Sequence, residues 1–441
     1  MVIKCTKQQE EKNNMIVAML DGRTEKLSPQ IAQMASVLFE NNKLNPNQEG
    51  SYSLQMIEEG HLYHYVFVNL LSSRKHTVRN LFLLFAAAFK TMKRNKSESV
   101  SVVLNEIEDI LTCEMLSKLL ELPILVSYEF NVYKSNCSEE TLKEVEFVLN
   151  REVPDSMVEK AVVVAESTTL ARNFVNHPSN YMTAQQLAKE AEELGNQYGI
   201  DVSVYHEDKI KEWGMGCFYN VEKGSREKPE LIVMRYKGNP NEEKTIGLIG
   251  KGVMFDSGGY NLKSKMATMH DDMGGAAAVV AAVVAAARNH LPVNVTAVVA
   301  ACKNMLSDTA QVPGDIIKSM SGKTVEMLNT DAEGRLTLVD AITYAIREEK
   351  VDVVIDIATL TGAAKGAVGN KCAAVLSNDD NWYQIIQKAS NESAEKIWRL
   401  DLDEELRSCL NSPVADIRNV SLGGTQGAGT AVAAMFIEAF T

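Results

Sequence analysis

The segment Asn329-Thr330-Asp331-Ala332-Glu333-Gly334-Arg335-Leu336 places two carboxylates and one guanidinium within eight residues. It lies between apolar runs, VEML before it and LTLVDAITYAI after it, that are typical of buried structure. A charged side chain beside a core is costly unless it is paired or bound to a metal ion. The segment therefore predicts either ion pairs or a metal site.

A carboxylate-rich metal site is the chemistry that these residues favour. Asp331 and Glu333 are two residues apart, so on an extended segment both side chains point to one face, about 6.6 Å apart at the backbone. Asp256 and Asp272 add two carboxylates, and histidine and cysteine are nearly absent nearby. Such oxygen ligands suit Zn²⁺, Mn²⁺, Co²⁺ or Mg²⁺. Two cations would offset four carboxylates, and a water bridging ions about 3.5–4 Å apart is a strong nucleophile at neutral pH.

Three other chemistries lack a required residue. The run Ser321-Gly322-Lys323-Thr324 imitates the end of a phosphate-binding loop, but Ile317 stands where that loop needs its first glycine. Gly250-Lys251-Gly252 is followed by Phe255 where a dinucleotide fingerprint needs its third glycine. The chain has no GxSxG elbow for a serine hydrolase, and DSGG at 256–259 is the nearest imitation.

The elements that must position these residues alternate between extended and helical patterns. In the first part, residues 76–94 and 108–121 predict helices, and residues 99–105 and 122–130 (LPILVSYEF) predict strands, as in a small α/β domain with a parallel sheet. Later strands are expected at 202–206, 229–238, 245–252, 293–302, 351–359 and 373–377, with helices at 272–289 and 335–349. This pattern predicts an α/β fold whose C-terminal sheet is mixed, largely parallel and sandwiched by helices.

We expect three parts along the chain. Residues 1–150 form the N-terminal α/β domain, residues 151–178 a connecting helix, and residues 179–441 the catalytic domain. Lys251 and Asp256 come after the TIGLIG run of one predicted strand, and Lys263 and Asp272 lie around the start of the next helix. Because ligands of such sheets bind beyond the carboxyl ends of strands, these side chains are expected to converge.

Composition narrows the class of protein further. The chain carries 45 basic and 58 acidic side chains, a net charge of −13, which disfavours nucleic acid as a partner. Its seven cysteines show no CxxC pair, and the N-terminus is too charged for a signal peptide. The longest uncharged run, residues 273–287, is shorter than the ~20 residues of a membrane span. These features predict a cytoplasmic protein without a membrane segment.

Several blocks resemble the leucyl aminopeptidase family, also called cytosol aminopeptidases. The matching blocks are GKGVMFDSGG (250–259), DDMGGAAAV (271–279), PGD (313–315), NTDAEGRL (329–336) and ATLTGA (358–363), and ARNFVNHPSN (171–180) and GGTQGAGTAVAAMF (423–436) match more weakly. They occur in the family's order, and NTDAEGRL is highly specific. The resemblance is strong from about Arg172 onward and only architectural before it.

The resemblance implies a role for each matching residue. The five metal ligands, which hold two divalent ions, fall on Lys251, Asp256, Asp272, Asp331 and Glu333. Lys263 matches the lysine that polarises the scissile carbonyl, and Arg335 matches the arginine that holds a bicarbonate ion as general base. The side-chain pocket falls on Met269, Asn329, Thr359, Leu360 and Gly362. The implied reaction is hydrolytic removal of a leucine-like N-terminal residue from a peptide by a homohexamer of two stacked trimers.

Two departures from the family and two alternatives remain open. The segment SKMATMHD (264–271) is shorter than usual, GYNLK replaces the usual GISIK, and the chain ends in an expected helix, as a truncated chain would.

One alternative function is a dipeptidase, for instance for cysteinylglycine, at the same site. The other is a non-catalytic nucleic-acid-binding or regulatory role, for which the basic run Lys90, Lys93, Arg94 and Lys96 is the feature to examine.

Overall fold

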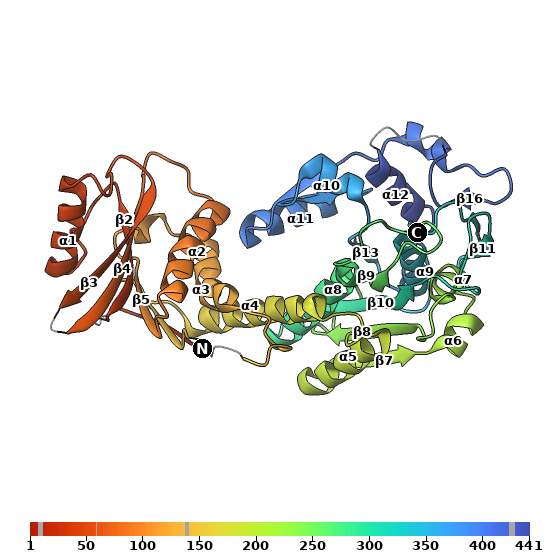
Figure 1. The fold of residues 1–441 in the computed structure, drawn as a ribbon, viewed down its shortest axis with the longest axis horizontal. Helices are drawn as coiled ribbons and strands as arrows, with labels where there is room; N and C mark the ends of the chain where they lie inside the picture. Colours follow the sequence, from red (N-terminus) through yellow and green to blue (C-terminus); the bar gives the residue numbers. More distant parts are fainter. Residues whose placement is uncertain (8–11, 59, 137–140, 423–427) are drawn as a thin grey trace. The chain divides into compact units, whose positions relative to one another are not determined.

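The structure is a computed structural model that describes residues 1–7, 12–58, 60–136, 141–422 and 428–441. It divides into two compact units. The first contains residues 1–166 and 381–396, and the second contains residues 167–380 and 397–441. Helix α4 (Asp155–Asn176) carries the chain from the first unit into the second (Figure 1).

The first unit is built on a six-stranded sheet in the order β1-β6-β5-β2-β4-β3. Every neighbouring pair is parallel except β3 with β4. The strands are β1 (Val2–Thr6), β2 (Asn14–Leu20), β3 (Gly50–Glu58), β4 (His61–Leu70), β5 (Ser99–Val103) and β6 (Glu144–Val148). The predicted small α/β domain with a largely parallel sheet is therefore present.

Helices cover both faces of this sheet. The apolar faces of α2 (Val78–Arg94) and α3 (Cys113–Ser127) pack with strand side chains into one core cluster. Helix α1 (Pro29–Glu40) packs with side chains of the opposite face into another, as Figure 1 shows. Strand side chains alternate between the two faces, so buried helices on both sides explain why β2 and β4 are apolar almost throughout.

One predicted strand of this unit is wrong. The LPILVSYEF segment continues α3 to Ser127, with Pro123 inside the helix, instead of forming a strand. Leu119, Leu120 and Leu122 are fully buried in the core cluster shared with α2. A short apolar run is ambiguous between buried helix and buried strand, and packing against α2 decides for the helix here.

The second unit contains a five-stranded mixed sheet in the order β13-β9-β10-β8-β7. The pairs β13–β9 and β9–β10 are parallel, whereas β10–β8 and β8–β7 are antiparallel. The strands are β7 (Asp201–Tyr205), β8 (Glu230–Lys237), β9 (Thr245–Asp256), β10 (Asn294–Asn304) and β13 (Val353–Ile357). The carboxyl ends of β9, β10 and β13 therefore meet at one edge of the sheet.

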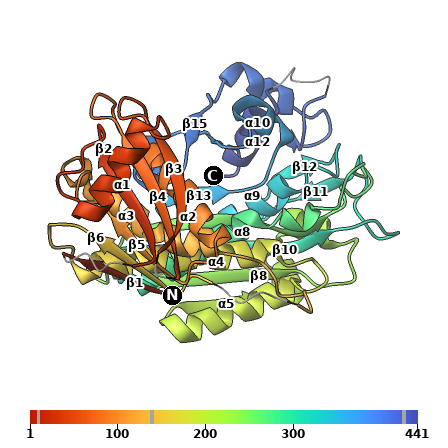
Figure 2. The same cartoon turned by 60° about the vertical axis from the view of Figure 1, so that its left-hand side comes forward.

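Helices pack on both faces of this sheet (Figures 1 and 2). Helices α5 (Ala184–Tyr198) and α8 (Gly274–Arg288) pack on one face, in a cluster with Ile232, Met234 and Val299 of the strands. Helices α7 (Gly216–Glu222), α9 (Gly334–Arg347) and α12 (Gly429–Glu438) pack with Val233, Ile249 and other strand residues of the opposite face. The mixed α/β class predicted from the sequence is confirmed.

The remaining elements are divided between the two units. They are α6 (Glu207–Glu212), α10 (Gly362–Val368), α11 (Asp380–Ser393), η1 (Glu108–Ile110), η2 (Met269–Asp271), η3 (Glu404–Leu410), β11 (Ile316–Lys318), β12 (Thr324–Glu326), β14 (Ala373–Val375), β15 (Ile397–Arg399) and β16 (Ile417–Arg418). The strand predicted at 373–377 is β14, which pairs with β15 in a separate small sheet. Residues 423–427 of the glycine-rich match near the C-terminus lie outside the described residues. None of the described helices is long and apolar enough to cross a membrane.

Candidate metal centre

The five predicted ligands come from three places in the second unit. Lys251 and Asp256 lie on the C-terminal half of β9, and Asp272 lies between η2 and α8. Asp331 and Glu333 lie in the loop that leads into α9. Strand β9 and the starts of α8 and α9 thus bring residues that are far apart in the sequence to one edge of the sheet.

Lys251 joins two of the acids in the buried part of the site. Its Nζ lies 2.7 Å from Asp272 Oδ2 and 2.9 Å from Glu333 Oε1, and it also donates a hydrogen bond of 3.3 Å to the Thr359 carbonyl. All three charged side chains are almost fully buried, with 3% of the Lys251 side chain exposed. Because Asp272 and Glu333 hold the Lys251 ammonium in place, it can contact only a ligand that binds at these two acids.

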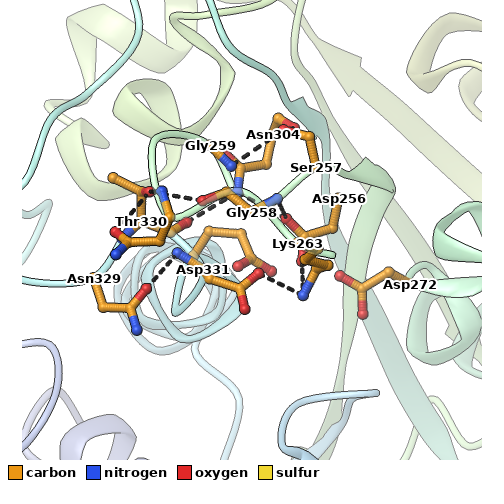
Figure 3. A network of polar contacts seen from close by, with 12 residues as sticks. Asp256, Ser257, Gly258, Gly259, Lys263, Asp272, Asn304, Asn329, Thr330 and Asp331 are labelled. Atoms are coloured by element: carbon orange, nitrogen blue, oxygen red, sulfur yellow. Dashed lines mark hydrogen bonds and ion pairs between the residues drawn. The ribbon is translucent and has the colours of Figure 1, made fainter. Parts of the chain in front are cut away.

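Lys263 joins the other two acids at the more open side. Its Nζ lies 2.7 Å from Asp256 Oδ2 and 2.5 Å from Asp331 Oδ1. Figure 3 shows the carboxylates of Asp256, Asp272 and Asp331 turned toward the region of this ammonium group. The side chains of Lys263 and Asp331 are 22% and 32% exposed, so this side of the site is open to a ligand from solvent.

Three of the carboxylates are close enough to share a cation. One ligand oxygen each from Asp256, Asp331 and Glu333 lies within 4.8 Å of the others. Glu333 Oε2 is buried and accepts no hydrogen bond from the described residues. Among the described residues, the four acids form ion pairs with two ammonium groups, and a buried carboxylate oxygen without a donor is costly. Both observations fit a site that holds divalent cations.

The ionisation of the acids depends on burial and on one another. Burial, together with the negative charge of Glu333, raises the pKa of Asp256 to about 6. Burial also raises the pKa of Asp272 to about 7, although the Lys251 ammonium opposes the shift. Burial acts on Glu333 in the same sense, but the charge and hydrogen bond of Lys251 outweigh it and lower the Glu333 pKa. Cations bound here would favour the ionised form of all these acids.

The two lysines are held in their charged form by the acids. Burial lowers the pKa of Lys251, but the charges of Glu333 and Asp272 outweigh it and raise the pKa above its usual value. Burial is likewise outweighed at Lys263, where hydrogen bonds to Asp256 and Asp331 raise the pKa. Only a divalent cation that replaces a proton can turn such a lysine into a ligand, because the amine binds metal in its neutral form.

Arg335 lies in the first turn of α9, directly after the acids. Its Nη1 donates a 2.8 Å hydrogen bond to the Asn419 carbonyl, and its Nε has no hydrogen-bond partner among the described residues. The side chain is buried, and burial lowers its pKa to about 10 even though Glu333 opposes this. A buried guanidinium with a free donor is suited to bind a small anion beside the site.

The five predicted pocket residues differ in how closely they join the site. Thr359 Oγ1 donates a 2.7 Å hydrogen bond to Asp272 Oδ1, and Asn329 Oδ1 accepts one of 2.8 Å from the Asp331 amide. Met269 lies in η2, Leu360 packs against the core beneath, and Gly362 begins α10. Within the described residues, no hydrogen bond joins these last three to the cluster. Their place in a side-chain pocket stays a prediction.

Asn304 is a residue of the site that the sequence analysis did not identify. It ends β10 and is the register partner of Asp256 on β9. Its Nδ2 donates 2.8 Å and 2.9 Å hydrogen bonds to Asp256 Oδ1 and the Thr330 carbonyl, as Figure 3 shows. Its position two residues after the predicted strand 293–302 was the available signal, because ligands gather at strand ends.

Asn419 is the second such residue, and it organises the loop of Asn329 to Glu333. Its Oδ1 accepts 2.9 Å and 3.3 Å hydrogen bonds from the amides of Leu328 and Asn329, and its Nδ2 donates a 2.7 Å bond to the Asn329 carbonyl. The residue is fully buried. It follows β16, far along the chain, and no local pattern marks it.

A helix-covered mixed sheet with clustered carboxylates and lysines at its strand ends fits a metal-dependent hydrolase of the α/β class. Comparison with known proteins specifies which kind. Residues 169–441, more than half of the chain, match the cytosol aminopeptidase family, catalytic domain. The chain therefore belongs to the cytosol aminopeptidase family.

Individual relatives agree with this assignment over the whole chain. A probable cytosol aminopeptidase of Clostridium perfringens is 39% identical over 446 residues, which cover 99% of this chain and 89% of the relative. A probable cytosol aminopeptidase of Fusobacterium nucleatum is 33% identical and covers 100% and 90%. The solved structure of a tomato leucine aminopeptidase mutant matches with a TM-score of 0.88 at 29% identity over 100% of this chain and 89% of that one.

Two conclusions follow from the comparisons. The chain is a metallo-aminopeptidase, which hydrolyses the N-terminal residue from peptides in a metal-dependent reaction. The similarity is not confined to the part after Arg172, because the alignment with the Clostridium perfringens relative covers almost the whole chain. The match to the family model itself begins at residue 169.

Proposed function

We propose that this chain removes leucine-like N-terminal residues from peptides with a water that bridges two divalent metal ions. The observation that carries this proposal is the convergence of Asp256, Asp331 and Glu333, whose ligand oxygens lie within 4.8 Å of one another. Zn²⁺ or Mn²⁺ are the ions we propose, with Co²⁺ or Mg²⁺ as substitutes, because the ligand atoms are mostly oxygen.

Five residues would hold the two ions, namely Lys251, Asp256, Asp272, Asp331 and Glu333. When bound, the ions would polarise the peptide carbonyl and lower the pKa of the bridging water. Lys251 would have to give up a proton to bind a metal ion. Its Nζ now lies 2.7 Å from Asp272 Oδ2 and 2.9 Å from Glu333 Oε1, and it is charged in these ion pairs. Metal binding should therefore release protons, and it should strengthen as the pH rises.

Two residues would act directly on the reacting groups. Lys263 remains charged because its acids raise its pKa, so its ammonium can donate to the carbonyl oxygen as negative charge develops there. Arg335 would hold bicarbonate as general base for the water, since its buried guanidinium has a donor without a partner among the described residues. The proposed side-chain pocket consists of Met269, Asn329, Thr359, Leu360 and Gly362.

Further proposals concern the context in which the enzyme works. We assign catalysis to residues 179–441. We propose a location in the cytoplasm because the relatives are named cytosol aminopeptidases. We propose a homohexamer because the resemblance to the leucyl aminopeptidase family implies one. The nucleic-acid alternative rests on the basic run at the end of α2, in which Lys90, Arg94 and Lys96 are exposed and Lys93 is already engaged. Lys93 Nζ donates to the carbonyls of Val126 and Ser127 and pairs with Glu129 at 2.9 Å, so its charge is already used within the first unit.

The test combines metal analysis with peptidase assays on the purified full chain. We expect leucine p-nitroanilide turnover to disappear on chelation and to return with Mn²⁺ or Zn²⁺. Asp331→Asn should remove most activity and weaken metal binding, whereas Asp401→Asn, at an exposed position outside the five predicted ligands, should change neither. Activity that survives complete removal of metal would contradict the mechanism.

Substrate comparison separates the aminopeptidase from the dipeptidase alternative. We expect leucine-initiated peptides of several lengths to be cleaved and N-acetylated versions to be resistant, because a free α-amino group is required. Cysteinylglycine cleaved far better than all longer leucine peptides would instead favour the dipeptidase.

A further inference from the structure

A second feature of the catalytic unit is a surface pocket of about 550 Å³ outside the metal centre. It lies between the α6–α7 segment, the turn that joins β11 to β12, and the end of α9. Lys211, Lys318 and Arg347 line it, together with the rings of Trp213 and Tyr219. None of its lining residues is acidic, although the chain as a whole carries a net charge of −13. Such a local excess of positive charge attracts anions.

Much of the positive charge in this pocket is not neutralised. Lys211 pairs with Glu207 at 2.5 Å, but exposed Lys318 has no ion-pair partner among the described residues. Arg347 donates 2.9 Å and 3.1 Å hydrogen bonds to the carbonyls of Met320 and Ser321, which are uncharged. Two cationic groups therefore remain available to an oxyanion.

The walls of the pocket are held in place by buried contacts. Asp340 on α9 accepts a 2.8 Å hydrogen bond from the Met320 amide on one wall and a 2.9 Å bond from the Phe218 amide on the other. Gly216 lies so close to Lys318 that an added Cβ would stand 2.1 Å from the Lys318 carbonyl oxygen. A pocket with tied walls loses little conformational freedom when a ligand binds.

The aromatic side chains indicate what else the ligand carries. Trp213 packs against Tyr344 with ring centroids 5.0 Å apart, and Lys211 Nζ lies 4.4 Å from the centroid of the Tyr219 ring. Both rings are half-buried and thus offer rigid apolar surface beside the cations. An oxyanion attached to an aromatic or apolar group would use both features.

The imitation of a phosphate-binding loop at residues 321–324 falls at this pocket but is not such a loop. Ser321 and Gly322 line the pocket, whereas Lys323 Nζ turns away to donate to the Ala439 carbonyl. Ser321 Oγ is engaged with Ser319 Oγ at 2.8 Å. The pocket therefore lacks the lysine that a polyphosphate would require, and a single oxyanion fits it better.

We propose that this pocket binds a small organic oxyanion, in which a phosphate or carboxylate meets Lys318 and Arg347 and an apolar or aromatic group meets Trp213 and Tyr219. The site is separate from the metal centre. Its walls stand on α9, whose first residue follows Glu333, and on the hairpin that precedes the loop of Asp331.

Calorimetric titration of the full chain at low salt tests the proposal with three probes of similar size. Phenyl phosphate represents the phosphate source, phenylacetate the carboxylate source, and benzyl alcohol is the neutral control. Lys318→Glu should weaken binding of the anionic probe by about tenfold or more, because it replaces a charge-assisted contact with repulsion. Lys318→Ala, which adds no repulsion, should weaken it less. Lys371→Glu makes the same change of net charge at an exposed position elsewhere and should leave binding unchanged.

Each outcome decides a part of the proposal. Binding of only one anion identifies the phosphate or the carboxylate as the group recognised, and binding of both identifies the shared oxyanion. Anions could also bind the metal centre, but such binding would persist in Lys318→Glu, and persistence at wild-type strength would overturn the proposal. No measurable binding of either anion, or equal binding of benzyl alcohol, would overturn it as well.

Discussion

Gly334 lies directly against the side chain of Lys251. A Cβ atom at position 334 would stand 2.4 Å from Lys251 Cε and 2.7 Å from its Nζ, closer than such atoms can approach. Gly334 is also the first residue of α9 and follows Glu333, to which the same Nζ is paired at 2.9 Å. The glycine of the NTDAEGRL segment thus leaves the space through which the lysine reaches the acids.

Gly334→Ala should displace the Lys251 amine from the site. Lys251 is buried and held by Asp272 and Glu333, so it cannot move aside without breaking these contacts. We expect metal affinity and kcat/KM to fall by about 10–100-fold, as is usual when a group that orients a metal site is disturbed. Isothermal titration with Zn²⁺ or Mn²⁺ and leucine anilide kinetics measure the two effects.

The matched control for this change is Gly366→Ala in α10. A Cβ at position 366 meets no atom within 4 Å, so this substitution should leave metal binding unchanged and stabilise the helix slightly. If Gly334→Ala bound metal as tightly as the wild type, the close approach would have no bearing on the site.

Asn304→Asp should weaken metal binding through Asp256. The amide now donates a 2.8 Å hydrogen bond to Asp256 Oδ1, and the substitution replaces this donor with a second negative charge. Asp256 would then be repelled from its position or take up a proton. We expect metal affinity to drop by about 10–100-fold, and dialysis against buffered metal measures it. Asn241→Asp, at an exposed position, should have no effect, and equal affinities of both variants would contradict the role of Asn304.

The sequence predicted that Asp331 and Glu333 converge, but the backbone conformation it assumed for them is wrong. An extended segment was expected to direct both side chains to one face. Glu333 instead has helical dihedral angles (φ −78°, ψ −36°) at the start of α9, and Asp331 lies in a turn. The two acids still meet because the chain reverses into the helix at this point. The short spacing was informative, but the local conformation depends on tertiary packing.

The strand-end position of Asp256 was predictable because it depends on element order alone. Asp256 ends a strand with a clear apolar pattern, and that pattern places it at the edge where ligands bind. Asn419 could not be found in this way, since its hydrogen bonds to residues 328 and 329 join segments about ninety residues apart. A single sequence carries no sign of such a contact. The full length of α3 was missed for a related reason, because packing against α2 decided it.

Asp340 should make the stability of the protein depend on pH. Burial raises the pKa of its carboxyl from 3.8 to about 7, against the hydrogen bonds from the amides of Phe218 and Met320. Between these two pH values the folded state holds a proton that the unfolded state has released. The contribution of this group to the free energy of unfolding is therefore complete below about pH 4 and is lost as the pH rises through about 7.

Asp340→Asn tests this dependence because an amide stays neutral at every pH. We compare the free energy of unfolding of the wild type with that of the variant. The wild-type value minus the variant value should decrease by roughly 2–3 kcal/mol between pH 5 and pH 8. Urea denaturation at the two pH values measures it, with Asp401→Asn as an exposed control. A difference that stays constant with pH would mean that Asp340 is already ionised in the folded protein at pH 5.

Lys263→Met should separate transition-state stabilisation from metal binding. The ammonium lies at the open side of the site, between Asp256 and Asp331 at 2.7 Å and 2.5 Å, and its charge is the one free to reach a substrate carbonyl. Methionine keeps the apolar stem and removes the charge. Loss of one donor to a developing oxyanion costs about 10²–10³ in kcat, so kcat should fall by that factor while KM changes much less. Metal content should be retained, because the acids lose a competing cation rather than a ligand.

Lys265→Met, two residues along the same loop at an exposed position, is the matched control and should keep most of kcat. A Lys263→Met variant that loses its metal, or that changes only KM, would place this lysine in the support of the acids instead of at the reacting carbonyl.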